Sequence, residues 1–420
     1  MSSKNYTIYH LHSDLSNGIT NIDSVTKYNQ YIERAQECGM KALGFAEHGN
    51  VFEWYHKKCD IEKAGMKYIH GCEFYLTNID PLLKKFRDNY HIVLMAKNYD
   101  GFLEINNLVT IAAQRDDKHF YYTPRITMEE LFGTSDNILV TTACLGGLLH
   151  KDKRKLDGIA NAFEYDDNAL ALSEANNTYD SLIENYIEWL TKNKHRCFLE
   201  IQHHDVEEQK EYNQYLYKLS LETGIPLIAG TDTHCLNKIH EIGRKMLQLG
   251  KKSHFEGEDD WDLTFKTYDE LVECYEIQDS LPKEVFLDAI ENTNTLADMV
   301  EEFSLSTETK YPKLYKAPEE TFVKHIYDKA KKHPYLNARY EWSELKKWLD
   351  EEIEVYKKTK SVDFMLLQEY LRDREKEMGV QCGYARGSVG GSMVAYALGI
   401  TEVDSKKFGL NFFRLVIKRK

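Results

Sequence analysis

The sequence lacks the features that mark disulfide-rich, membrane and repetitive proteins. Its eight cysteines are scattered and include no Cys-x-x-Cys pair, so they predict reduced thiols rather than a disulfide framework. No apolar run approaches the roughly 20 residues that span a bilayer, and no signal peptide is recognisable. Internal repeats and low-complexity tracts are missing as well. These absences favour a cytoplasmic globular protein.

An excess of positive charge is also missing. The chain has 54 lysines and arginines against 68 aspartates and glutamates, which gives a formal charge of −14. This balance argues against indiscriminate binding of nucleic acid over the whole surface, although a local basic channel needs only a few cations. With 420 residues, of which 42% are hydrophobic, the chain is long enough for two or three domains and a large core.

The first 240 residues contain a recurring arrangement of apolar runs and metal-binding side chains. Each run predicts a short strand, and a histidine, carboxylate or thiol stands at its end or close beside it. Strand ends that deliver such groups to one side of a βα scaffold build a single polar site. The runs are residues 6–11, 41–46, 66–72, 92–96, 138–142 and 226–229. The candidate ligands are His10, His12, Glu47, His48, Glu73, His91, Cys144, Asp232 and His234.

A set of this size would hold more than one divalent cation. His10 and His12 lie two residues apart in a strand, so both side chains leave the same face. Asp232 and His234 repeat that spacing after a later strand. The mixture of nitrogen, oxygen and sulfur ligands favours zinc, manganese or iron over magnesium alone. Two or three such cations neutralise a phosphate, lower the pKa of a bound water and stabilise a leaving oxygen, which predicts phosphoester hydrolysis.

Some of these residues also have a plainer interpretation. Glu73 stands in an apolar strand, where a carboxylate is costly unless it is paired or binds a metal. His91 is also consistent with a turn cap, and Cys144 with a small core residue. His203 and His204 follow another strand but face opposite sides of it, so neither is included among the ligands.

The order of elements predicts an α/β fold followed by a helical region. Strand-like runs alternate with helix-like ones up to about residue 235, which favours βαβ units and a mostly parallel sheet or barrel. A polar stretch, residues 151–178, has little strand signal and is interpreted as an excursion from the barrel. Beyond about residue 240 the spacing of apolar residues predicts helices only. The expected helices are 24–38, 99–113, 209–223, 239–249, 268–274, 284–303, 319–331 and 342–358.

The ligand motifs resemble, in the same order, those of the polymerase-and-histidinol-phosphatase (PHP) domain. The resemblance implies a distorted (β/α)7 barrel with a trinuclear metal site at one end. Residues 122–126 and the Leu-rich turn after them are similar to one branch of the family, the α subunit of bacterial C-family replicative DNA polymerases. The matching strings are His10-Leu-His12-Ser, Glu47-His48-Gly-Asn, Gly71-Cys-Glu73-Phe-Tyr, His91-Ile-Val-Leu, Ala143-Cys144-Leu-Gly-Gly and Thr231-Asp232-Thr-His234.

The second part of the chain resembles the beginning of the polymerase palm. A Gly- and Ser-rich loop, residues 383–392, precedes an apolar stretch and is similar to the palm loop that binds the triphosphate of the incoming nucleotide. Glycines let backbone N–H groups approach phosphate, and a following helix N-terminus adds a favourable potential. The resemblance implies a PHP domain over residues 1–285 and a truncated palm over 286–420. The implied nucleotide-binding residues are Arg386, Gly387, Ser388, Gly391 and Ser392.

From this resemblance we expect a role in DNA replication, with primer-template DNA and deoxynucleoside triphosphates as partners. The PHP site would bind zinc or manganese and act as a 3′–5′ exonuclease, whereas magnesium would serve polymerase chemistry in the complete enzyme. One alternative is an inactive PHP domain that braces the polymerase. The other is a free-standing PHP phosphoesterase, which would not need residues 286–420.

The chain departs from the family pattern in three places. Where the family has Asp-Gly shortly after the first histidine pair, this chain has Asn17 followed by glycine, so one metal would either bind weakly or recruit Asp14 or Asp23 instead. Tyr384 and the alanine after it replace the usual Pro-Gly ahead of the loop. No pair of aspartates follows Ile400, so the catalytic carboxylates of the palm are not identified in this sequence.

Without those carboxylates, we expect no primer extension by this chain alone. The paired aspartates that hold the polymerase metals would then come from a second polypeptide. Two apolar stretches near the end, residues 393–400 and 410–417, are expected to leave exposed faces that require neighbours.

Overall fold

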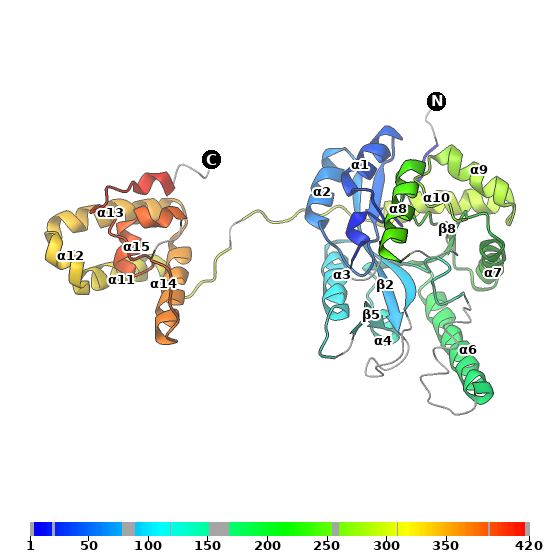
Figure 1. The fold of residues 1–420 in the computed structure, drawn as a ribbon, viewed down its shortest axis with the longest axis horizontal. Coiled ribbons are helices and arrows are strands. Elements are labelled where there is room, and N and C mark those ends of the chain that lie inside the picture. The colour runs from blue at the N-terminus through cyan, green and yellow to red at the C-terminus, as the bar shows by residue number, and fades with distance from the viewer. Residues whose placement is uncertain are drawn as a thin grey trace. The chain divides into compact units, whose positions relative to one another are not determined.

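The structure is a computed structural model that divides into two compact units, Met1–Ser304 and Leu305–Lys420, which are described separately (Figure 1). The expected boundary at residue 285 falls inside helix α10 (Lys283–Met299), which belongs to the first unit. Thr293 Oγ1 of α10 accepts a hydrogen bond from the N–H of Thr7 at 2.9 Å, and Asn294 donates to the carbonyl of Asn5. The residues that the structure describes are 4–18, 22–77, 89–117, 119–150, 168–253, 260–308, 310–384 and 387–415.

A curled mixed sheet forms the centre of the first unit. Its strands run in the order β4-β5-β2-β3-β6-β7-β8, and β1 pairs with β2 outside this path. Apart from β4 and β5, the strands are almost entirely buried and most of their side chains are apolar, as expected for a sheet that helices cover. Their bounds are β1 Ala42–Phe45, β2 Lys67–Thr77, β3 Tyr90–Ala96, β4 Phe120–Tyr121, β5 Thr123–Thr127, β6 Ile138–Thr141, β7 Cys197–Ile201 and β8 Leu227–Ala229.

The segment that carries the first two histidines completes a ring of seven strand-like segments. It bridges to β1 through Ile8 and Leu43, and it bridges through Leu11 and Thr233 to the chain just after β8. The N–H of His12 donates to the carbonyl of Thr233 at 2.8 Å. The ring therefore runs from this segment through β1, β2, β3, β6, β7 and β8, and the PHP-like α/β fold expected from the sequence is confirmed.

One strand of the ring runs against the others. β3 is antiparallel to both β2 and β6, whereas β1–β2, β6–β7 and β7–β8 are parallel pairs. Because of this reversal the first residues of β3 lie at the same end of the sheet as the last residues of the parallel strands. His91 therefore comes to the ligand end although it begins its strand, and in register it faces Tyr75 of β2.

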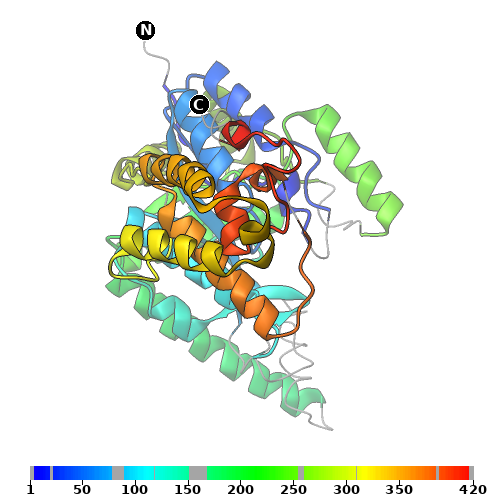
Figure 2. The ribbon, with the colours of Figure 1, turned by 90° about the vertical axis from the view of Figure 1, so that its left-hand side faces the viewer.

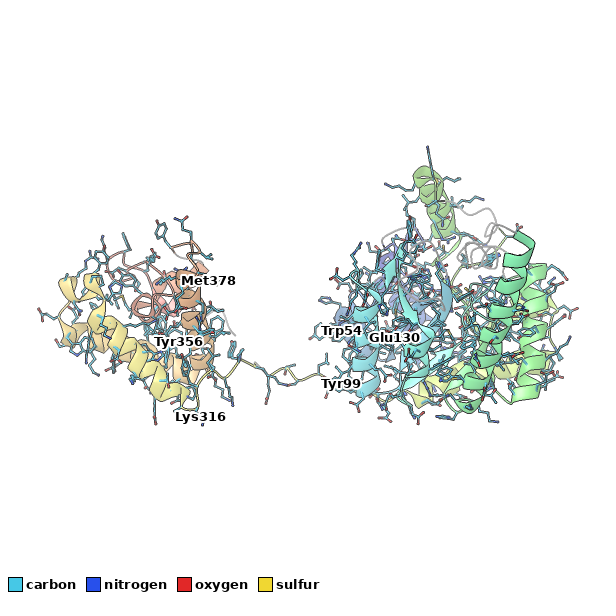
Figure 3. The ribbon with its side chains drawn as sticks, turned by 90° about the horizontal axis from the view of Figure 1, so that it is seen from below. Trp54, Tyr99, Glu130, Lys316, Tyr356 and Met378 are labelled. Carbon is cyan, nitrogen blue, oxygen red and sulfur yellow. The ribbon has the colours of Figure 1, made fainter. Side chains whose placement is uncertain are left out.

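Helices cover the outside of the ring. Local signals set several of their ends: α4 and α9 begin with capping boxes at Thr127 and Thr267, and α7 ends at Gly224, whose φ of 71° favours glycine. Trp54 of α2, labelled in Figure 3, packs against Phe102 of α3 with ring centroids 4.7 Å apart. The bounds are α1 Tyr28–Glu37, α2 Trp54–Lys63, α3 Tyr99–Ala112, α4 Met128–Phe132, α6 Asn168–Lys192, α7 Glu207–Thr223, α8 Lys238–Lys251 and α9 Tyr268–Gln278.

The stretch interpreted as an excursion, residues 151–178, contains the start of α6. Residues 151–167 lie outside the described residues. From Tyr179 on, α6 buries Tyr179 and Tyr186 against the core of the unit. The Tyr179 hydroxyl donates to the carbonyl of Leu148 at 2.7 Å, so this helix is tied to the chain that follows β6.

Helix α8 is turned with its polar side inwards. Arg244 and Gln248 are its buried residues, whereas Ile239, Ile242 and Met246 are more than half exposed. Such an arrangement is the reverse of an ordinary amphipathic surface helix. The inward polar groups therefore need partners in the unit, and these partners lie next to the metal-binding residues.

The second unit is a small helical body around α15 (Met393–Leu398), which is red in Figures 1 and 2. Every residue of α15 is buried, and its neighbours include Phe322, Leu349 and Tyr356, the last labelled in Figure 3. The remaining helices are α11 Pro318–Lys332, α12 Pro334–Arg339, α13 Trp342–Lys358 and α14 Val362–Glu377, with 3-10 turns η3 Gly387–Gly391 and η4 Phe412–Leu415.

The expectation of an exposed apolar face over residues 393–400 is wrong. Helices α11 and α13 pack around α15, so no sheet is needed to cover it. In the second apolar stretch Leu410 and Phe413 are exposed and Phe412 is buried, while residues 416–417 lie outside the described part of the chain. Among the described helices, none combines the length and apolar character that a membrane span requires.

Candidate metal centre

Eight of the predicted ligands converge at one end of the ring. Within the described residues, seven of them form three overlapping groups in which the possible ligand atoms lie within 4.8 Å of one another, and Asp232 lies beside these groups. His12 belongs to two of the groups, and so does Glu73. The groups are His10, His12 and Glu73; Glu73, His91 and Cys144; and His12, His48 and His234.

The first group lies deepest and also includes Asp232. The Nε2 atoms of His10 and His12 are each 3.2 Å from Asp232 Oδ1, and they lie 3.8 Å and 3.4 Å from Glu73 Oε2. All four side chains are buried. Asp232 has a left-handed φ of 43°, and Ala143, next to Cys144, has one of 59°; strained backbone of this kind clusters at functional sites.

The polar atoms of this group face one another without satisfying one another. Within the described residues, His10 Nε2, His12 Nε2, Asp232 Oδ1 and both carboxylate oxygens of Glu73 are buried and make no hydrogen bond. A buried polar atom left in this state costs about 1–3 kcal/mol, and more when it is charged. Divalent cations between these atoms would satisfy all of them at once, so the donor set fits a metal site.

The second group adds the thiol. His91 Nδ1 lies 2.6 Å from Glu73 Oε1 and 3.5 Å from Cys144 Sγ, and the N–H of Gly146 donates to that sulfur at 3.3 Å. A Cβ at Gly146 would lie 2.9 Å from the His91 ring, so only glycine fits there. Burial raises the pKa of the Cys144 thiol, and Asp232 and Glu73 raise it further, so a cation is needed to favour the thiolate.

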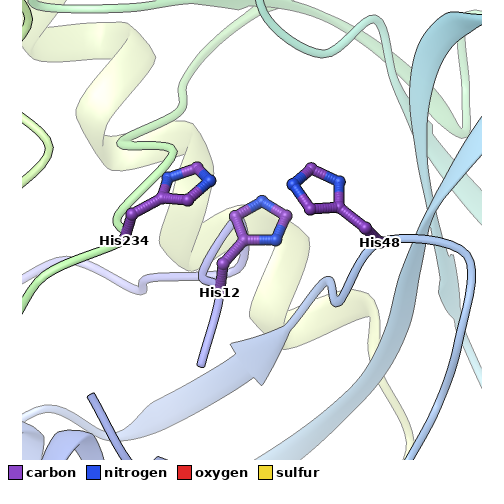
Figure 4. A group of neighbouring side chains, drawn as sticks. All are labelled: His12, His48 and His234. Atoms are coloured by element: carbon purple, nitrogen blue, oxygen red, sulfur yellow. The ribbon is translucent and has the colours of Figure 1, made fainter. Parts of the chain in front are cut away.

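The third group consists of imidazoles. Figure 4 shows His12 between His234 and His48, and its ring centroid lies 4.4 Å and 4.2 Å from theirs. Burial and the neighbouring His12 lower the pKa of His234, which keeps the ring in its neutral, metal-binding form. His234 Nδ1 also lies 2.7 Å from the carbonyl of Asp232, which fixes the ring orientation.

Glu200 in β7 contacts the cluster and is a candidate positioning residue that the sequence analysis missed. Its Oε1 lies 2.6 Å from His10 Nδ1, while Tyr9 and Thr141 donate to its Oε2. A carboxylate in this position holds the Nδ1 proton of His10 and leaves Nε2 free to bind a metal. A Cβ at Gly230 would lie 2.1 Å from Glu200, so glycine is required beside it. The signal was available: like Glu73, Glu200 is a carboxylate within an apolar strand.

The structure does not support Glu47 as a ligand. Its carboxylate accepts hydrogen bonds from Ser13 and Ser16 and forms a buried ion pair with Lys57 at 2.5 Å. Burial alone would raise the pKa of Glu47, but Lys57 and the hydrogen bonds from Ser13 and Ser16 together outweigh it, and the pKa falls to about 2. Glu47 therefore fixes the turn after the first histidine pair rather than facing the cluster.

His203 and His204, which were left out of the ligand set, are outside the three groups. Both are buried, and the ring of His204 stacks on Trp261 with centroids 5.3 Å apart. Burial lowers the pKa of His204 to about 4 and that of His203 well below its usual value, so both rings are neutral.

The Gly- and Ser-rich loop of the second unit differs from this cluster, because the described polar groups at its end, around Ser392, are already paired. Ser392 Oγ donates to Glu352 at 2.6 Å, accepts from the Tyr356 hydroxyl and caps the N–H of Ala395. The N–H groups of Met393 and Val394 also donate to Glu352, at 2.9 and 3.0 Å.

The N-terminus of α15 is thus occupied by a carboxylate of the protein itself. Ser392 is buried, and a Cβ at Gly391 would lie 2.9 Å from the carbonyl oxygen of Asn411, so both residues have structural roles. Gly387 is exposed, with a φ of 63°. Arg386 and the side chain of Ser388 lie outside the described residues.

Comparisons with known proteins agree with this arrangement. Residues 9–204 match the PHP domain family, and residues 319–420 match the bacterial DNA polymerase III alpha NTPase domain family. The chain is 29% identical to DNA polymerase III subunit alpha of Borreliella burgdorferi over 97% of this chain and 33% of the relative. It is 29% identical to that of Helicobacter pylori over 99% and 34%, and 28% identical to that of Aquifex aeolicus over 99% and 35%.

The chain spans about a third of the length of the curated relatives that it matches. The resemblance to a PHP domain, followed by a polymerase α-subunit region, is therefore confirmed.

Proposed function

We propose that the cluster binds divalent cations, zinc or manganese, and hydrolyses phosphodiester bonds at the 3′ ends of DNA. The observation that carries the proposal is the set of buried, unsatisfied atoms of His10, His12, Glu73 and Asp232. Metal ions bound there would supply a water of lowered pKa and stabilise the charge of the phosphate and the leaving oxygen.

The protein's own residues have distinct parts in this site. Asp232 and Glu73 supply the negative charge, and Glu73 joins two of the ligand groups because its two oxygens face different histidines. Glu200 keeps the His10 proton on Nδ1. Since Glu47 and Lys57 neutralise each other, neither contributes net charge to the cluster.

We further propose that the chain takes part in template-directed DNA synthesis, as the relatives' name suggests. Primer-template DNA and deoxynucleoside triphosphates would be its substrates, with Arg386, Gly387 and Ser388 contacting the triphosphate. In this proposal the paired carboxylates and their magnesium ions would come from a second polypeptide, as the resemblance to the polymerase palm implies. This chain alone would then extend no primer.

A labelled primer-template and a phosphate monoester, each incubated with the protein and Mn²⁺ or Zn²⁺, test the proposal. Loss of nucleotides from the 3′ end by the wild type, and not by Asp232→Asn, is the expected result. Cleavage of the monoester alone would favour the free-standing phosphoesterase. A protein that binds metal but cleaves neither substrate would favour the alternative of an inactive PHP domain that braces the polymerase. Asn17 is consistent with this alternative, because an amide is a poorer metal ligand than a carboxylate.

A further inference from the structure

Asn17 stands where the family pattern has a carboxylate ligand, and its amide is fully engaged by the backbone. Its Oδ1 accepts from the N–H groups of Asp23 and Ser24 at 2.7 and 3.0 Å, and its Nδ2 donates to the carbonyl of Ser24 at 2.6 Å. A carboxylate could make the first two bonds but not the third. Asn17 is therefore a clamp on residues 22–24 rather than a metal ligand.

Helix α8 holds the same short segment from the other side. Arg244 Nε donates to the carbonyl of Asp23 at 2.7 Å, and Gln248 Nε2 donates to that of Ile22 at 2.8 Å. Ser24 Oγ donates to the carbonyl of His234 at 2.6 Å, which ties the segment directly to a metal-binding residue. These contacts explain why α8 turns its polar side inwards.

The result is a carboxylate aimed at the imidazole group. Asp23 Oδ2 lies 3.8 Å from His48 Nε2, with side chains 16% and 12% exposed. Within the described residues, this is the one ion pair or hydrogen bond recorded for the Asp23 carboxylate. On the other side of the ring, His48 Nδ1 is buried and makes no hydrogen bond, although Glu73 Oε2 is 2.8 Å away. Asp14, the other acidic residue near Asn17, is paired with Lys27 instead.

We propose that Asp23 is the carboxylate ligand of the cation held by His48 and His234, in place of the ligand lost at Asn17. The proposal rests on the metal site proposed above. Three neutral imidazoles leave both charges of a divalent cation uncompensated, and one carboxylate halves that excess. Two ligand atoms about 2.1 Å from a tetrahedral ion are about 3.4 Å apart, so the observed 3.8 Å requires only a small side-chain adjustment.

Metal stoichiometry and affinity of the full chain test this assignment without any activity assay. The wild type, Asp23→Asn, Asn17→Asp and Asp14→Asn are dialysed against defined free Mn²⁺ or Zn²⁺, and bound metal is counted by mass spectrometry and titrated with a competing chelator. Asp14→Asn is the matched control, because it removes a nearby carboxylate that points to Lys27. Circular dichroism and thermal unfolding establish that each variant is folded.

We expect Asp23→Asn to lower the binding affinity of one of the bound ions by at least about tenfold and to leave the affinities of the others unchanged. Asn17→Asp should lower the binding affinity of the same ion, because the side chain no longer donates a hydrogen bond to the carbonyl of Ser24. Asp14→Asn should bind metal as the wild type does. Wild-type affinity in Asp23→Asn would overturn the assignment while leaving the metal site intact, as would tighter binding in Asn17→Asp. A wild type that binds no metal would overturn the metal site and this assignment together.

Discussion

The two predicted ligand sites of this chain, the metal cluster of the first unit and the Gly- and Ser-rich loop of the second, look equally convincing as motifs but differ in their bonding. In the cluster, histidine nitrogens and carboxylate oxygens face one another within 3.2–3.8 Å and remain without hydrogen bonds. In the loop, Ser392 and two N–H groups at the start of α15 are satisfied by Glu352. Buried polar groups that are left unpaired indicate a site for an external ligand, whereas paired ones indicate structure.

The contrast is sharpest when the cluster ligands are removed. Replacing His10, His12 and Asp232 together by alanine should reduce bound Mn²⁺ or Zn²⁺ to background and lower any nuclease activity by more than about a hundredfold, since even outer-shell changes cost about 10–100-fold. Elemental analysis of the purified chain measures this. The control is His56→Ala, which alters an exposed histidine that is paired with Glu53. Equal metal content in both variants would show that the cluster is not a metal site.

His70 is a buried histidine of the first unit that has hydrogen-bond partners for both ring nitrogens, so we expect it to affect acid stability rather than metal binding. The Tyr68 hydroxyl donates to His70 Nδ1 at 2.8 Å, and His70 Nε2 lies 3.2 Å from Asn106 Oδ1. Burial lowers the pKa of His70 to about 3. The unfolded chain therefore binds a proton at this histidine more readily than the folded chain does. The contribution of neutral His70 to the free energy of unfolding is complete above pH 6.5 and is lost as the pH falls towards 3.

This loss amounts to about 4 kcal/mol if the site does not relax. The midpoint of urea unfolding, measured from pH 7 to pH 3.5 in the presence of chelator, should fall less steeply for His70→Gln than for the wild type. Identical slopes would show that His70 does not govern acid stability.

Glu200 tests whether the cluster depends on the residue that orients its deepest histidine. In Glu200→Gln the amide can donate to His10 Nδ1, which moves the ring proton to Nε2, the atom that should bind metal. Metal affinity should drop about 10–100-fold while the thermal midpoint of the metal-free protein changes little. Unchanged affinity would mean that Glu200 is only a core hydrogen-bond partner of Tyr9 and Thr141.

Periodicity and strand-end chemistry predicted a mostly parallel sheet or barrel and most of the cluster, whereas the seven-membered ring was implied by the resemblance to the PHP domain. The spacing of His10 and His12, and of Asp232 and His234, follows from strand geometry alone. His91 was found by its position beside an apolar run, although the reversal of β3 that brings it to the site was not foreseen. Local sequence patterns therefore identified the predicted metal ligands that stand at or beside the end of a strand.

Long-range pairing could not be predicted from the sequence. Glu47 looked like a ligand because its partner, Lys57, lies in the following helix, and no pattern shows that the two meet. Likewise, the local sequence around Ser392 suggested a phosphate ligand, because the residue that satisfies its hydroxyl, Glu352, is forty positions away in α13. Helices α11 and α13, which cover α15, also precede it by many residues, so its burial followed from tertiary packing rather than from local sequence.

The smallest expected effect concerns the loop, and it tests the other half of the comparison. Ser392→Ala removes the cap of α15 and a partner of Glu352, and it should destabilise the second unit by about 1 kcal/mol. Bound metal and the affinity of the chain for deoxynucleoside triphosphates should stay unchanged, because Ser392 is buried and already paired. Ser306→Ala, at an exposed serine near the start of the second unit, is the control for urea unfolding and for nucleotide titration. If Ser392→Ala were as stable as the wild type but bound nucleotide more weakly, the hydroxyl would be a triphosphate ligand after all, and pairing within the protein would no longer distinguish the two sites.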